Sequence, residues 1–144
     1  MLAILPLLAY LATTPIQLQQ PATPTSLAVA DVPATLTRAH IVVFGKPPSR
    51  ARLSIAIGQV RLEGLTLPGR NLGGLEYERG KAWVRVDRLT RLRAFHSYHD
   101  ASVAYWGLLA ARCKGALHAM DGGDADEVAV RLARCGYFQA PLAW

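Results

Sequence analysis

A proline-rich stretch divides the sequence and limits what can fold. Residues 13–33 carry Pro15, Pro21, Pro24 and Pro33 among Thr, Gln and Ser, a composition that favours an extended linker over a helix. The folded unit should therefore begin near Ala34. The 144 residues, 51% hydrophobic and 18% charged, suit one domain with an adequate core. We expect an N-terminal segment over residues 1–33 and a single domain over 34–144.

The first residues contain an apolar run of signal-peptide length, Leu2 to Ala12. This run is too short to cross a bilayer as a stable span. It has no positive charge before it, and the nearest A-x-A site, residues 28–30, lies far downstream. Both a cleaved signal peptide and a retained N-terminal segment stay open.

Helix-capping signals mark out the rest of the chain. A short helix over residues 34–44 should end at Gly45, and Ser49 should cap a second helix that ends at Gly64. Ser97 and Asp124 open capping boxes for two later helices, with a short helical piece around residues 115–120 between them. A Gly-rich loop over 65–74 and a β-hairpin over 75–86, turning at Arg79-Gly80, complete the pattern. It predicts an α+β fold that is mostly α-helical.

Charge and cysteine content narrow the classes of partner. The pI of about 9.8 favours polyanions such as nucleic acid, anionic lipid or an anionic cell wall. The basic residues are scattered and no nucleic-acid motif accompanies them, so we expect a solvated surface and no nucleic-acid partner. Cys113 and Cys135 form no CxxC pair, and no metal or cofactor is expected. They are either a disulfide or two buried thiols.

Glu63 is the acidic residue in the least ordinary position. It occupies the last turn of an apolar helix, where the negative end of the helix dipole and the apolar neighbours both raise a carboxyl pKa. Most other acids are explained by capping or by exposed surroundings, which leaves Glu76, Glu78 and Asp87. Only Glu63 is expected to hold a proton near neutral pH, as a general acid must. The alternative is a surface glutamate at a helix end.

The remaining candidates have ordinary explanations. Glu76 and Glu78 should share one face of a strand, with Tyr77 on the other. A metal site at His96, His99 and Asp100 would have poor geometry around the cap. Four aromatic residues at helical or helix-flanking positions are read as core rather than as a sugar platform. These are Tyr98, Tyr105, Trp106 and Tyr137.

Five motifs, taken in order, resemble one enzyme family. They are residues 55–63 (IAIGQVRLE), 71–74 (NLGG), 93–98 (RAFHSY), 104–109 (AYWGLL) and 133–137 (ARCGY). In order and spacing they resemble the bacterial glucosaminidase domain of glycoside hydrolase family seventy-three, found in flagellar, autolysin and phage peptidoglycan hydrolases. The resemblance covers about residues 34–140. It departs after Glu63, where Gly-Leu-Thr-Leu replaces the usual E-S-G-W-G continuation.

The resemblance implies a lysozyme-like fold that cleaves the β-1,4 bond of peptidoglycan glycan strands without metal or cofactor. Glu63 would be the catalytic acid and Glu76, or else Glu78, the second carboxylate, while Asn71 orients the loop and Tyr77 contacts the sugar. It also implies export to the periplasm or cell envelope, or a place in a virion or larger envelope assembly. Because of the departures, a catalytically silent wall-binding or virion component is the main alternative. A basic nucleic-acid-binding domain is a weaker one, since no stacking platform is visible.

Overall fold

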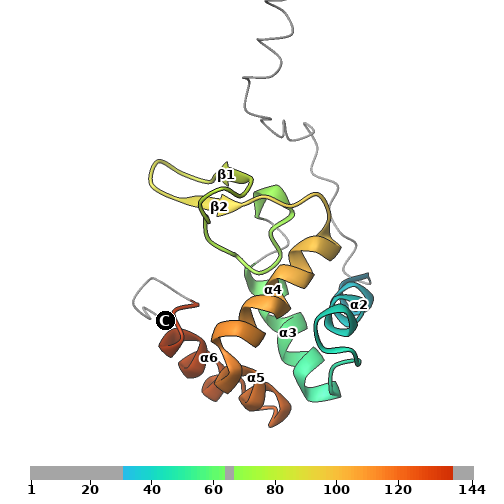
Figure 1. Cartoon of the computed structure of the whole chain (residues 1–144). Helices are drawn as coiled ribbons and strands as arrows, with labels where there is room; N and C mark the ends of the chain where they lie inside the picture. The colour runs from blue at the N-terminus through green and yellow to red at the C-terminus, as the bar shows by residue number, and fades with distance from the viewer. Residues whose placement is uncertain (1–30, 64–66, 138–144) are drawn as a thin grey trace, which may run out of the picture.

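The computed structural model describes residues 31–63 and 67–137, without the side chains of residues 61–63. The expectations for the apolar N-terminal run, the linker up to residue 30 and Gly64 lie outside these residues. Five α-helices, a 3₁₀ turn (η2, Pro68–Arg70) and two short strands make up the described part (Figure 1). The expected mostly helical α+β class is confirmed.

Local capping chemistry sets most helix ends. Helix α2 (Val32–Phe44) starts two residues before the expected Ala34 and ends at Gly45, whose φ of 73° forms a left-handed cap. Helix α3 (Arg50–Glu63) begins after Ser49, whose hydroxyl accepts a hydrogen bond from the Arg52 amide at 3.1 Å. The expectations for both helices are confirmed within the described residues.

The later helices follow the predicted caps as well. Ser97 accepts from the Asp100 amide at the start of α4 (Tyr98–Arg112), and α5 (Lys114–Asp121) follows almost at once. Asp124 accepts from the Glu127 amide at the start of α6 (Ala125–Arg134). The chain leaves α6 through Gly136 at a φ of 77°, as predicted from the sequence.

The core is built around α4. Tyr105, Trp106 and Leu109 on this helix are completely buried. The Trp106 indole donates to the Leu36 carbonyl at 3.0 Å, which ties α4 to α2. Three of the aromatic residues expected in the core, Tyr105, Trp106 and Tyr137, are buried there, and Tyr98 packs against the cluster as a partly buried side chain.

The hairpin predicted over residues 75–86 does not form, because the two paired strands lie further along the chain. Strands β1 (Trp83–Arg85) and β2 (Arg91–Arg93) form the antiparallel pair, with Val84 opposite Leu92. The turn at Gly80 exists, because the Lys81 amide donates to the Glu78 carbonyl at 3.1 Å, but its two arms do not pair with each other. Instead Glu76 bridges to Leu92 on the far side of β2. The alternation over 75–86 could not specify this, because register depends on the partner strand.

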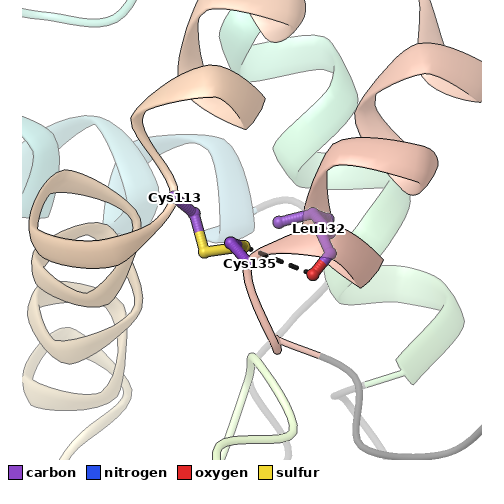
Figure 2. The surroundings of a disulfide bond; sticks show 3 residues. All are labelled: Cys113, Leu132 and Cys135. Atoms are coloured by element: carbon purple, nitrogen blue, oxygen red, sulfur yellow. Dashed lines mark hydrogen bonds between the residues drawn. A yellow bond between two sulfur atoms is a disulfide. The ribbon is translucent and has the colours of Figure 1, made fainter.

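Cys113 and Cys135 form a disulfide, with their Cα atoms 5.4 Å apart. Cys113 lies between α4 and α5, and Cys135 follows α6 (Figure 2). The sequence left open whether these residues were bonded or free, and the structure selects the bond.

None of the described helices is both long and apolar enough to cross a membrane.

Candidate functional site

A pocket of about 210 Å³ opens between the sheet and the end of the helical body. It is formed by four separate parts of the chain: the segment before the Gly80 turn, β2, the second half of α4, and the residues after α6. The lining residues are Leu75, Glu76, Tyr77, Glu78, Arg93, Leu108, Arg112, Gly136 and Tyr137. At this volume the pocket is smaller than a typical site for a drug-sized ligand.

Glu76 is the carboxylate of this pocket with a perturbed acidity. Partial burial raises the pKa of Glu76 above its usual range, while the positive charge of Arg112 acts in the opposite direction. The expectation that only Glu63 holds a proton near neutral pH stays a prediction, because the Glu63 side chain lies outside the described residues. The raised pKa of Glu76 could not be predicted from the sequence, because its neighbours in the pocket come from α4 and from the residues after α6.

Glu78 also lines the pocket but is engaged by a neighbour. One of its carboxylate oxygens lies 3.4 Å from a guanidinium nitrogen of Arg93. The same guanidinium lies over the ring of Phe95, 4.8 Å from its centroid. Glu78 therefore has a cationic partner on β2, whereas the nearest cationic influence on Glu76 is Arg112.

Tyr77 lies at the pocket edge with 40% of its surface exposed. Its ring is 6.3 Å from that of Trp83, edge to face, and the Arg91 guanidinium lies 5.8 Å from its centroid. Its half-exposed ring presents an apolar face at the edge of the pocket. Because Tyr77 lines the same pocket as both glutamates, the three are not cleanly divided between two faces.

Asn71 is buried, and its side chain holds the loop under the pocket. Its amide nitrogen donates to the carbonyls of Leu75 at 2.7 Å and Arg93 at 3.0 Å, and its oxygen accepts from the Leu75 amide at 2.8 Å. With 0% exposure and both ends of the amide bonded within the protein, Asn71 is placed to orient the loop. Its expected part in substrate binding stays a prediction.

The loop beyond Asn71 is packed against two tyrosines. The Tyr137 hydroxyl donates to the Gly73 carbonyl. A side chain at position 73 would meet Tyr105 Cδ2 at 2.9 Å and the Tyr137 hydroxyl at 3.0 Å, so only glycine fits. Tyr137 had been assigned to the core from sequence, and it also forms part of the pocket wall.

Glu63 is the last residue of α3, and its side chain lies outside the described residues. One helical turn earlier, Gln59 accepts a hydrogen bond from the Tyr105 hydroxyl at 2.7 Å. The last turns of α3 are thereby anchored to the same tyrosine that contacts the Asn71–Gly74 loop. The raised pKa expected for Glu63 stays a prediction.

Arg112 is the functional candidate that sequence reasoning missed. Nothing local in the sequence distinguishes it from the other scattered basic residues. Its place in the pocket depends on how α4 packs against the segment that carries Glu76. His96, His99 and Asp100 do not form a metal-ligand cluster, and no such cluster of three or more occurs within residues 31–63 and 67–137.

No protein-family model and no curated protein matches the chain. Among solved structures, the chain is similar to the glycoside hydrolase domain from Salmonella typhimurium FlgJ. The similarity covers 80% of each chain at 18% sequence identity, with a TM-score of 0.48. This level of likeness assigns neither a reaction nor any residue role to this chain.

Proposed function

We propose that this protein is a peptidoglycan hydrolase that cleaves the β-1,4 glycosidic bond of glycan strands, of the N-acetylglucosaminidase type. The observation that carries the proposal is the pocket that holds Glu76, a carboxylate with a raised pKa, beside the half-exposed ring of Tyr77. The motifs that resemble the glucosaminidase family support it from the sequence side, because three of them contribute Arg93, Leu108 and Tyr137 to the lining of this pocket.

The proposed chemistry uses two carboxyl groups. Glu63 protonates the glycosidic oxygen between N-acetylglucosamine and N-acetylmuramic acid as the bond breaks. Glu76, as the ionised carboxylate, assists the attacking water or stabilises the positive charge that develops on the sugar. Arg112 favours this ionised form, because its positive charge lowers the pKa that burial raises.

The other residues position the substrate. Tyr77 contacts the sugar with its ring, and Asn71 acts through the loop that it holds rather than by touching the glycan. The reaction needs no metal or cofactor, since proton transfer and charge stabilisation suffice for it. A disulfide suits an exported protein of the periplasm or cell envelope, because such bonds persist in oxidising compartments.

The test is digestion of purified peptidoglycan, with the products identified by mass spectrometry. New N-acetylglucosamine reducing ends are the expected product. Reducing ends on N-acetylmuramic acid would make the protein a muramidase instead, and non-reducing anhydro-N-acetylmuramic acid ends would make it a lytic transglycosylase. If the glycan stays intact while the protein still binds the wall, the protein is a catalytically silent wall-binding component and not a hydrolase.

Three substitutions assign the roles of the carboxylates. Glu63→Gln should lower the rate by about 10²- to 10⁴-fold, the usual value of general acid catalysis, because an amide cannot deliver the proton. Glu76→Gln should also slow turnover, and Glu78→Gln should matter less because Glu78 is paired with Arg93.

Glu127→Gln is the matched control, because Glu127 bonds Arg131 on α6, away from the pocket. Melting temperature and wall binding should stay near the parent values in the Glu63 and Glu76 variants. A Glu63→Gln protein that cuts glycan at the parent rate would show that the acid has been misassigned.

A further inference from the structure

The β1–β2 hairpin and the residues just before it combine exposed apolar side chains with a high positive charge. Of the seven large hydrophobic residues that are exposed in the described part, four belong to residues 77–89. These are Tyr77, Trp83, Val86 and Leu89. Single exposed apolar residues are ordinary, but such a concentration on one projecting element is not. Figure 1 shows this hairpin at the opposite end of the molecule from α5 and α6.

Leu89 is the most exposed of these residues, with 95% of its surface free. The tip that carries it is closed by a hydrogen bond from the Val86 amide to the Thr90 carbonyl at 3.0 Å. One carboxylate oxygen of Asp87 accepts from the amides of Leu89 and Thr90, both at 2.8 Å. The turn is thus held in one shape by three hydrogen bonds, and it presents the leucine outward.

The hairpin and the turn that precedes it, residues 79–93, also carry a large share of the net positive charge of the protein. Residues 79–93 contain six basic residues and one acidic residue, a net charge of +5, while the whole chain has a net charge of +6. Five of the six are exposed, namely Arg79, Lys81, Arg85, Arg88 and Arg91. The sixth, Arg93, faces Glu78 and Phe95 at the pocket.

An anionic lipid surface matches this combination. Basic side chains near such a surface are attracted to the negative headgroups, apolar side chains insert among the acyl chains, and Trp is favoured at the interface between water and lipid. An anionic polymer would be complementary to the charge but would leave Leu89 and Val86 in water. We propose that the β1–β2 hairpin docks the protein on an anionic lipid bilayer, with Leu89 inserted at the tip.

The test measures co-sedimentation of the whole protein with vesicles of phosphatidylcholine and phosphatidylglycerol at 3:1, and with phosphatidylcholine alone. Binding should require the anionic lipid and weaken as salt is added. Leu89→Ser should weaken binding about tenfold or more, because the insertion of a leucine side chain is lost. Arg88→Gln should weaken it about fivefold, the value of one basic residue near the surface.

Matched controls lie on α6, far from the hairpin. Val130→Ser and Arg134→Gln change exposed residues of the same kinds and should bind like the parent. Leu89→Trp should bind more tightly than the parent, because Trp is favoured at the interface, and this gain cannot come from misfolding. Circular dichroism should show that every variant is folded.

Three results would overturn the proposal. The first is no binding to the anionic vesicles, and the second is equal binding to neutral ones. The third is vesicle binding that Leu89→Ser and Leu89→Trp both leave unchanged, which would mean that the hairpin recognises charge alone, as it would on an anionic polymer. The vesicles contain no glycan, so failure here is distinct from failure of the proposed hydrolase activity.

Discussion

At the scale of single residues, Glu76 and Arg112 set the electrostatics of the pocket. Burial raises the pKa of Glu76 and Arg112 lowers it, so removing the arginine should raise that pKa further. If Glu76 acts as the ionised carboxylate, activity is lost as the pH falls through its pKa. The acid limb of kcat/KM against pH should therefore move to higher pH in Arg112→Gln. Arg134→Gln is the control and should leave the acid limb in place. An unmoved acid limb in Arg112→Gln would show that Arg112 does not influence the ionisation of Glu76.

His40 provides a second test at this scale, one that concerns stability. Its Nδ1 atom lies 2.6 Å from the Lys46 carbonyl and must donate to it, so its Nε2 atom accepts from Arg52 at 3.1 Å. Arg52 in turn binds Asp121 at 2.6 Å. A second proton, on Nε2, would point at the positively charged guanidinium group of Arg52. Desolvation, the largest cause, lowers the pKa of His40, with Arg52 adding to the effect while the Lys46 carbonyl and Asp121 oppose it.

The sign of the resulting pH dependence follows from this lowered pKa. The unfolded chain takes up the His40 proton below a pH of about 6.5, whereas the folded chain resists it, so stability falls as the pH drops through that region. The free energy of unfolding should decline by at most about 1.4 kcal/mol per pH unit from this group. Urea unfolding at pH 7 and pH 5 should show a smaller decline in His40→Gln than in the parent or in the control His96→Gln. Equal declines of the unfolding free energy in all three proteins would contradict the conclusion that folding keeps His40 neutral.

At the scale of elements, the disulfide joins the end of α6 to the junction of α4 and α5. The bond links two residues that are 22 positions apart in the sequence. Breaking a disulfide that closes a loop of this size lowers the free energy of unfolding by about 3 kcal/mol. Cys113→Ser combined with Cys135→Ser should lower Tm, and so should reduction of the parent. Since Gly136 and Tyr137 follow the bond directly and line the pocket, KM for glycan should rise as well. A fully reduced parent with an unchanged Tm would contradict the prediction.

At the scale of the whole molecule, one core joins the helices, and the hairpin lies largely outside it. The buried cluster draws on every α-helix of the described part and on the Asn71 loop. Among the residues of β1 and β2, only Leu92 is buried. Elements with few buried contacts open locally, at a lower free energy than global unfolding.

Hydrogen exchange should therefore divide the molecule in two. Amides in the middle of α4 should exchange only by global unfolding, with a steep dependence on denaturant, whereas those of β1 and β2 should exchange earlier and with a shallow dependence. Equal protection in the two regions would show that the hairpin is part of the same cooperative unit.

What the sequence determined by itself is local. Ser49, Ser97, Asp124, Gly45 and Gly136 mark helix ends because a cap involves only residues within about four positions of it. Those signals were enough for the α+β class and for the order of the helices.

Tertiary structure decided what depends on distant partners. The bridge between β2 and Glu76, the choice of a disulfide over two thiols, and the raised pKa of Glu76 beside Arg112 all join residues far apart in the chain. Strand register, bond formation between cysteines and desolvation of a carboxyl group each depend on which surfaces meet in space. No pattern within one segment carries that information, so the environment of the candidate site emerges only when α4, β2 and the end of α6 have packed together.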